Sequence, residues 1–232
     1  MIAVITAMKI ESERVISNMT DIREENAGHV KTYVGKISDV DAVVCISGVG
    51  KVNAAATTQA VIMRYAPEII INIGVAGTAA NELGIGDFVV GSSYVQFDVD
   101  TSPIGDPKYM ISGINKIVIE SDAELCKRAV SVAKALFPQK NVTEGRIASS
   151  DKFIGGENAY LKNEAIALGA SCVEMESGAI AQVALINDVS YIAVRTISDS
   201  ADGEAPVSFV EFCENAAHNA ELWLMEFIKQ IK

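Results

Sequence analysis

The sequence predicts an α/β fold in which residues 1–232 form a single domain, a three-layer sandwich with helices on both faces of a mixed, mostly parallel central sheet. Short apolar runs alternate with longer amphipathic segments, the order expected where helices connect the strands of a parallel sheet. Residues 68–74, EIIINIG, are almost all apolar, which is typical of a strand covered on both faces. Half of the 232 residues are apolar, which is enough for one sizeable core.

The first half of the chain predicts a strand, a helix, two strands joined by a short turn, and a second helix. The opening run IAVIT is apolar throughout, as in a buried strand, and the turn between the next two strands is Ser-Asp-Val. Pro67 ends the helix that precedes the run 68–74. We expect strands at 2–6, 31–37, 41–47, 68–74 and one or two within 87–100, with helices at 11–19 and 51–65.

The second half of the chain alternates helices and strands. The segment 122–137 is amphipathic and stops before Pro138, and Gly169 can cap another helix because glycine readily adopts the left-handed conformation that ends many helices. We expect helices at 122–137, 157–169, 177–187 and 209–230, and strands at 171–175 and 191–198. Since ligands of such sheets bind at the carboxyl ends of the strands, the residues that follow each strand are the candidates for a site.

The charge of the chain excludes several classes of partner. There are 30 Asp and Glu residues against 19 Lys and Arg, which gives a formal net charge of −11, and no basic run is present. Binding to a phosphate backbone needs clustered Lys and Arg, so we expect no nucleic-acid partner and no association with an anionic membrane surface. A small neutral ligand is compatible with this charge.

Cysteine usage and hydropathy indicate a cytoplasmic protein. The four cysteines form no CxxC pair and only two histidines are present, which argues against a metal site and for reduced thiols. The apolar N-terminus lacks a basic region and soon meets Lys9 and Glu11, unlike a signal peptide. The richest apolar run is interrupted by Asn72, Gly74 and Gly77, which is inconsistent with a membrane span.

Three carboxylates follow three of the predicted strands. Glu11 follows the first strand, Glu176 follows strand 171–175, and Asp199 follows strand 191–198. Taken singly, each acid is equally compatible with a helix N-cap or first-turn position. A glycine loop, GVGKVNA, also opens the helix at 51–65; its free N–H groups suit a ribose hydroxyl or an anion, although it is not a Walker A loop. The combination of acids, rather than any one of them, indicates a site.

Six segments together resemble a known family. AMKIE, SGVGKVNAA, INIGVAGT, SSDKFI, VEMESGAIA and RTISDSAD, in this order, resemble the 5′-methylthioadenosine/S-adenosylhomocysteine nucleosidases, which belong to the nucleoside phosphorylase superfamily. The pairing of VEMES with RTISDSAD is specific, whereas the glycine loops alone are not. The resemblance covers nearly the whole chain. It implies a nucleoside phosphorylase-like fold, hydrolysis of the N-ribosidic bond of 5′-thio-adenine nucleosides, and no cofactor or metal.

The resemblance assigns roles to the three acids. Asp199 matches the general acid that protonates N7 of adenine, a task that needs burial or a partner to raise its pKa. Glu11 matches the base that activates the attacking water, and Glu176 matches the residue that binds the ribose hydroxyls. Glu174 has no assigned role; we expect its backbone beside the purine and its side chain turned away.

The resemblance also implies a binding shell around the nucleoside. The expected roles are purine stacking by Phe153, backbone contacts to the purine edge by Ile154, ribose packing by Met175, orientation of the water or of Glu11 by Arg195, support of the acid by Ser198, and an apolar 5′ pocket formed by Met8, Val49 and Phe209. Ile104 matches a residue that each subunit lends to its neighbour's pocket, so a homodimer is implied.

Three departures from the family pattern affect what the resemblance implies about the reaction rate and about the preferred 5′ substituent. Val75 stands where serine is usual, Phe97 where histidine is common, and Ile104 where phenylalanine is frequent.

Three alternative functions stay open. One alternative is a purine nucleoside phosphorylase, which would need arginines and hydroxyls around the phosphate dianion. The others are hydrolysis of a related adenine nucleoside such as 6-aminofutalosine, and a non-catalytic nucleoside-binding protein.

Overall fold

Strands and helices alternate along the chain much as predicted. The structure, a computed structural model, describes residues 1–231. Its strands are β1 (Ile2–Thr6), β2 (Thr20–Ala27), β3 (Val30–Ile37), β4 (Val40–Ile46), β5 (Ile69–Thr78), β6 (Phe88–Gln96), β7 (Val118–Glu120), β8 (Val142–Ser149), β9 (Ala170–Glu174) and β10 (Ser190–Asp199). Its helices are α1 (Lys9–Ser17), α2 (Lys51–Tyr65), α3 (Ala123–Leu136), α4 (Lys162–Ala167), α5 (Ser177–Ile186) and α6 (Ala205–Gln230), with 3₁₀ turns η1 (Ser102–Ile104) and η2 (Gly156–Leu161).

The ten strands form one mixed sheet whose centre is parallel. The strand order is β10-β6-β8-β9-β5-β1-β4-β3-β2, with β7 paired to β6. Strands β4, β1, β5 and β10 are mutually parallel neighbours, whereas β2, β3 and β4 form antiparallel hairpins at one edge. Because β10 also pairs with β5, the strands β5, β9, β8, β6 and β10 close into a ring. The predicted mixed sheet is therefore confirmed, but it is partly closed rather than an open layer.

Strand β5 has two successive partners along one of its edges. Residues Ile69 to Asn72 pair with β1, and only Gly77 and Thr78 pair with β9, while β10 follows the other edge throughout. Between Asn72 and Gly77 this edge of β5 has no strand beside it. The gap opens at the carboxyl end of β1, where the sequence places a ligand site.

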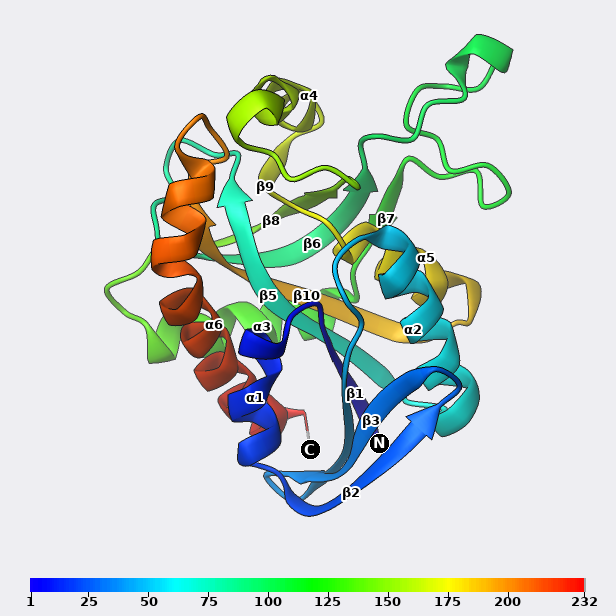
Figure 1. Cartoon of the computed structure of the whole chain (residues 1–232), viewed down its shortest axis with the longest axis vertical. Coiled ribbons are helices and arrows are strands. Elements are labelled where there is room, and N and C mark those ends of the chain that lie inside the picture. Colours follow the sequence, from blue (N-terminus) through cyan, green and yellow to red (C-terminus); the bar gives the residue numbers. More distant parts are fainter. Residues whose placement is uncertain (232) are drawn as a thin grey trace.

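Helices cover both faces of the sheet and create two main cores. Figure 1 shows α1, α3 and α6 on one side and α2 and α5 on the other. The first core includes Val15, Ile71, Ala129 and Trp223, and the second includes Val61, Ile70 and Ile180. Ile70 and Ile71 are neighbours in β5 and face opposite cores, as expected for a strand buried on both sides. No helix described for residues 1–231 is long and apolar enough to cross a membrane.

Three strands were not predicted, and several boundaries differ. Strand β2 is a polar, mostly exposed edge strand, and β8 carries Glu144, Gly145 and Arg146, so neither shows an apolar run. Strand β7 has only three residues. The segment 87–100 contains one strand, β6, and the predicted helix 157–169 divides into η2 and α4. Helix α6 begins at Ala205, because Pro206 fits the first turn of a helix.

Candidate active site

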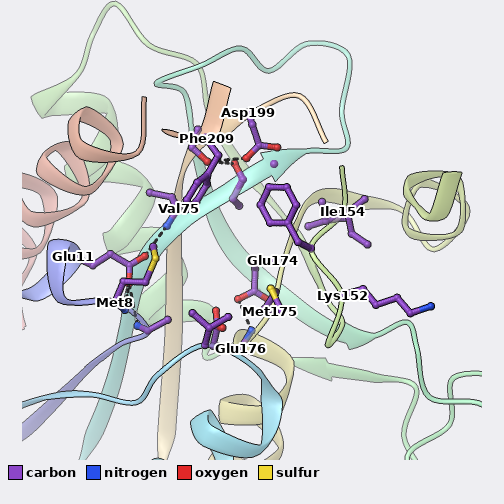
Figure 2. A pocket seen from close by; sticks show the side chains of 17 residues that line it. Met8, Glu11, Val75, Lys152, Ile154, Glu174, Met175, Glu176, Asp199 and Phe209 are labelled. Carbon is purple, nitrogen blue, oxygen red and sulfur yellow. Dashed lines mark hydrogen bonds between the residues drawn. The ribbon is translucent and has the colours of Figure 1, made fainter. Parts of the chain in front are cut away.

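One cavity of about 410 Å³ lies at the gap along β5. All but two of the predicted site residues line it: Met8, Glu11, Val49, Val75, Phe153, Ile154, Met175, Glu176, Ser198, Asp199 and Phe209. Figure 2 shows Glu11, Glu176 and Asp199 on different sides of the cavity. The three strand-end acids therefore come together in space, although 188 residues separate the first from the last (199 − 11).

Glu11 lies in the first turn of α1 and is fixed by backbone donors just before that helix and in β5. Its Oε2 accepts hydrogen bonds from the N–H groups of Ala7 (3.0 Å) and Met8 (2.8 Å), and Oε1 accepts one from Val75 (3.3 Å). The N–H of Val75 lies where the β1/β9 edge of β5 has no strand beside it, so the carboxylate takes the place of a strand partner on that edge. Burial raises the pKa of Glu11, although these amides and the charge of Arg195 oppose the shift.

Asp199 ends β10 and is held by its immediate neighbours. Oδ2 accepts a hydrogen bond from the Ser198 hydroxyl (2.9 Å), and Oδ1 accepts one from the N–H of Ala201 (2.9 Å). Burial raises the pKa of this carboxyl, and the two hydrogen bonds work in the opposite direction. A side chain that keeps its proton to a higher pH than an ordinary aspartate is suited to act as an acid.

Two glycines of β5 make room for these two acids. A Cβ atom on Gly74 would lie 2.8 Å from Glu11 Oε1, and one on Gly77 would lie 2.5 Å from Asp199 Oδ1. Both distances are shorter than a normal non-bonded contact, so any larger residue would displace the carboxylate. The motif IGVAG therefore provides clearance for two side chains from other elements.

Glu176 stands at the start of α5 and faces the glycine loop. Its Oε1 accepts a hydrogen bond from the N–H of Gly50 at 2.8 Å, and the residue is 7% exposed. Burial and the neighbouring charge of Glu174 raise its pKa, whereas the Gly50 amide lowers it. With one bond to protein on one oxygen, the carboxylate has acceptor capacity for hydroxyl donors from a ligand.

Comparisons with known proteins identify the family of the chain. The sequence model of the Phosphorylase superfamily matches residues 1–229. The 5′-methylthioadenosine/S-adenosylhomocysteine nucleosidase of Staphylococcus haemolyticus is 36% identical over 231 residues, 99% of each chain. The chain belongs to this nucleosidase family within the phosphorylase superfamily.

Solved structures of family members have the same fold. The nucleosidase from Neisseria meningitidis in complex with methylthio-immucillin-A superposes with a TM-score of 0.92 at 32% identity, covering 99% of this chain and 98% of that one. A futalosine hydrolase of Helicobacter pylori superposes with a TM-score of 0.90 at 31% identity, covering 99% and 97%. The nucleoside phosphorylase-like fold predicted from the sequence is thus confirmed.

Two of the residues that the family resemblance assigned lie outside the cavity lining. Ile104 is 84% exposed in η1, on the segment between β6 and β7 that projects from the body of the molecule (Figure 1). Arg195 is buried beneath the cavity, and within residues 1–231 its hydrogen bonds go to Glu174, Asn72, Ser177 and the Val194 carbonyl rather than to Glu11. Its charge still acts on the pKa of Glu11.

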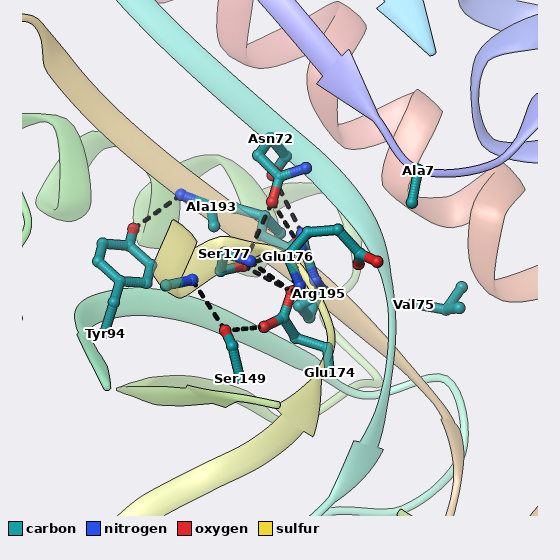
Figure 3. Close-up of polar contacts among 12 residues, drawn as sticks. Ala7, Asn72, Val75, Tyr94, Ser149, Glu174, Glu176, Ser177, Ala193 and Arg195 are labelled. Carbon is teal, nitrogen blue, oxygen red and sulfur yellow. Dashed lines mark hydrogen bonds and ion pairs between the residues drawn. The ribbon is translucent and has the colours of Figure 1, made fainter. Parts of the chain in front are cut away.

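A buried polar network holds the turn that carries Glu176 (Figure 3). Arg195 Nη2 donates to Glu174 Oε2 at 2.7 Å, and both side chains are at most 3% exposed. The same carboxylate accepts from the N–H groups of Glu176 (3.1 Å) and Ser177 (2.8 Å), and its other oxygen accepts from the Ser149 hydroxyl. Ser149 and Arg195 could not be predicted as partners of Glu174 from sequence, because they lie on β8 and β10 and meet this carboxylate only in the folded chain.

The apolar part of the cavity contrasts with the acids. The rings of Phe153 and Phe209 meet edge to face at 5.7 Å, and Met8 and Phe209 pack against a small cluster that includes Val75 and Cys213. Sequence reasoning missed five lining residues: Ala7, Ala76, Gly77, Lys152 and Val173. Most are small or contribute backbone, so their types carry little signal. Glu174, whose backbone was expected beside the purine, also lines the cavity.

No group of His, Cys, Asp and Glu residues in the described chain has the arrangement of a metal site.

Proposed function

We propose that the chain hydrolyses the N-ribosidic bond of 5′-thio-adenine nucleosides, methylthioadenosine and S-adenosylhomocysteine, releasing adenine and the thioribose. The observation that carries the proposal is the placement of Glu11 and Asp199, two buried carboxyl groups with raised pKa values, in the wall of one cavity. Cleavage of such a bond needs a proton for the leaving base and a base for the attacking water. Separate carboxyl groups can supply both.

Each predicted residue has a place in this reaction. Asp199, supported by Ser198, protonates N7 of the departing adenine, and Glu11 removes a proton from the water that attacks the anomeric carbon. Glu176 accepts hydrogen bonds from the ribose hydroxyls, with Met175 packed on the sugar. Phe153 stacks on the purine, the backbone of Ile154 contacts its edge, and Met8, Val49, Val75 and Phe209 surround the 5′ end. Arg195 acts indirectly, through Glu174.

Water is favoured over phosphate as the nucleophile by charge. The N–H groups of Gly50 and Lys51 at the start of α2, which suit an anion, already donate to the carboxylates of Glu176 and Asp151. Lys152 is the one Lys or Arg among the residues that line the cavity, and Glu11 adds negative charge. A phosphate dianion would need a cationic clamp instead.

A futalosine-type nucleoside is a second candidate substrate. The Helicobacter pylori protein described as a futalosine hydrolase is nearly as similar to this chain as the Neisseria meningitidis nucleosidase is. 6-Aminofutalosine and the 5′-thio-adenine nucleosides share the adenine base and the ribose ring, so discrimination between them rests on the 5′ end of the cavity. Val49 at that end is 47% exposed, which leaves the 5′ end open to larger substituents.

We also propose that the enzyme is a cytoplasmic homodimer of one-domain subunits that acts in methionine salvage. The proposal rests on the family resemblance, in which the residue matching Ile104 reaches the neighbouring subunit's pocket, and Ile104 is accessible to such a neighbour because it is 84% exposed on a projecting segment. A second copy of the chain would then complete the 5′ pocket. Light scattering that gives the mass of one chain at micromolar concentration would overturn this assembly.

Adenine release from methylthioadenosine by the purified chain tests the function. We expect turnover by the wild type and, for Asp199→Asn, a loss of about 10²–10⁴-fold in kcat, because asparagine keeps the shape of the side chain but cannot transfer a proton to N7. Calorimetry should still detect nucleoside binding by the variant. Absence of turnover by the wild type would refute the proposal, and turnover by Asp199→Asn within tenfold of wild type would remove Asp199 from the acid role.

A further inference from the structure

Three charged residues close a ring of hydrogen bonds at the rim of the cavity. Lys51 Nζ donates to Asp98 Oδ1 at 2.5 Å, and the other oxygen of Asp98 accepts from the N–H of Asp151 at 2.8 Å. Asp151 Oδ1 in turn accepts from the N–H of Lys51 at 2.7 Å. The three residues come from the start of α2, the segment after β6 and the segment after β8. The ring therefore ties the start of α2 to the ends of β6 and β8, which pair with each other up to Gln96 and Ser149.

Each side of the ring continues into a wall of the cavity. Gly50 precedes Lys51, and its N–H is the hydrogen-bond donor to Glu176. Asp151 precedes Lys152, Phe153 and Ile154, all of which line the cavity. The spacing between the ribose side and the purine side of the cavity thus depends on the contact between Lys51 and Asp151.

The contact is close and partly shielded from solvent. Gly50 has a φ of +97°, and a Cβ atom placed on it would lie 3.2 Å from Asp151 Oδ1, so the aspartate sits directly against the glycine loop. The side chains of Lys51 and Asp98 are 14% and 26% exposed. An ion pair at this depth is screened less than a surface pair and holds a more defined geometry. By contrast, the Lys31–Glu24 pair on the β2–β3 hairpin has side chains that are 55% and 60% exposed.

We propose that Lys51, Asp98 and Asp151 are positioning residues that set the distance between the glycine loop and residues 152–154, and so determine the affinity for the nucleoside. The inference rests on the proposed function for the identity of the ligand. None of the three needs to touch the substrate. Glu11 and Asp199 are held by other elements, so the ring acts on binding and leaves the chemical step to them.

The test compares Lys51→Met with the conservative Lys51→Arg and with Lys31→Met as a matched control. Methionine keeps the length and packing of the lysine stem but cannot hold Asp98, whereas arginine restores a donor. We expect Lys51→Met to raise the KM for methylthioadenosine by about tenfold with kcat within about threefold of wild type, the pattern of lost uniform binding. Lys51→Arg should recover most of the affinity, and Lys31→Met should behave as wild type.

Amide hydrogen exchange supplies a readout that needs no substrate. In Lys51→Met the N–H groups of residues 51 and 151 should exchange at least about tenfold faster than in wild type, because Asp98 loses its cation, Asp98 accepts from the N–H of Asp151, and Asp151 in turn accepts from the N–H of Lys51. Faster exchange with an unchanged KM would show a purely structural ring and overturn the proposal. So would unchanged exchange, or an equal rise of KM in Lys31→Met.

Failure of the proposed function gives a different result. If the wild type binds methylthioadenosine but releases no adenine, the hydrolase reaction is refuted, and the dissociation constants of the same variants, measured by calorimetry, still test the ring. We then expect the same tenfold weakening in Lys51→Met, about 1.4 kcal/mol by the usual conversion. A wild type that binds no adenine nucleoside would contradict both inferences.

Discussion

Gly77 lies against Asp199 so closely that a single added carbon would collide with the carboxylate, at 2.5 Å from Oδ1. The same carbon would lie 2.9 Å from the Cβ of Ala201, whose N–H holds that oxygen. Asp199 is the last residue of β10, and Ala201 follows it and donates to its carboxylate, so a shift of either residue would displace the acid.

Gly77→Ala should therefore reduce kcat by about 10²-fold or more, since a displaced general acid loses most of its contribution. Gly84→Ala is the control, because its added carbon would meet nothing closer than Asp87 Oδ2 at 3.9 Å. Steady-state kinetics with a melting curve for each variant would separate misplacement of the acid from unfolding. A fully folded Gly77→Ala with wild-type kcat would contradict the clearance argument.

The pH dependence of activity should be bell-shaped, with both limbs displaced upward. Glu11 must lose its proton to act as a base and Asp199 must keep its proton to act as an acid, and burial raises the pKa of each. Activity should rise with pH above the ordinary pKa of glutamate and should fall at a pH above the ordinary pKa of aspartate. Profiles of kcat/KM for the wild type would check this, and the alkaline limb should disappear in Asp199→Asn.

The same raised pKa values set the sign of the pH dependence of stability. A carboxyl group with a raised pKa binds its proton more tightly in the folded chain than in the unfolded one, so its contribution is fully present below the unfolded pKa and is lost as pH rises through the folded pKa. Asp199→Asn should consequently lose less unfolding free energy than the wild type as pH rises from about 4 to 8. Urea titrations at several pH values measure this, and parallel curves would count against a buried, raised Asp199.

Removing one member of the Glu174–Arg195 pair should cost more than removing both. Arg195→Met leaves a buried carboxylate without its cation, for which we expect a loss of about 3–5 kcal/mol in unfolding free energy. The double variant Glu174→Gln/Arg195→Met removes both charges and should recover part of that loss. Denaturant unfolding of the two single variants and the double variant would provide the cycle. Additive effects would mean that the ion pair at 2.7 Å contributes no coupling.

The 5′ end of the cavity should prefer a thioether to a hydroxyl. Met8, Val49 and Phe209 offer no strong hydrogen-bond partner, and burying an unpaired hydroxyl costs roughly 1–3 kcal/mol. We expect kcat/KM for methylthioadenosine to exceed that for adenosine by at least about tenfold. Equal values for the two nucleosides would refute the assignment of this pocket.

Much of the fold follows from sequence because apolar runs and helix signals are local. The helix at 51–65 was predicted with the bounds that the structure shows, and the alternation of apolar strands with helices predicted a sheet covered on both faces. Strands β2 and β8 could not be predicted, since their polar residues are placed by pairing with neighbours and not by an apolar pattern. The closure of the five strands β5, β9, β8, β6 and β10 into a ring likewise depends on β5 pairing with β10, which no local signal encodes.

The acids of the site could be predicted, but the groups that hold them could not. Glu11, Glu176 and Asp199 follow strands, and strand ends of a parallel sheet converge. Gly74 and Gly77 acquire their meaning only from carboxylates 63 and 122 residues away (74 − 11 and 199 − 77). Arg195 was expected near the water or Glu11, and its bonds to Glu174, Asn72 and Ser177 depend on three segments that meet only in the folded chain.

Identification of the sugar product tests the central claim most directly. Methylthioadenosine is incubated with the enzyme at several phosphate concentrations, and the sugar is examined by NMR. If water activated by Glu11 is the nucleophile, the product is free methylthioribose, formed at a rate that does not depend on phosphate. By analogy with other single displacements, the configuration at the anomeric carbon is inverted. A sugar 1-phosphate formed at a rate that rises with phosphate would contradict the hydrolytic mechanism, while leaving the fold and the position of Asp199 unchanged.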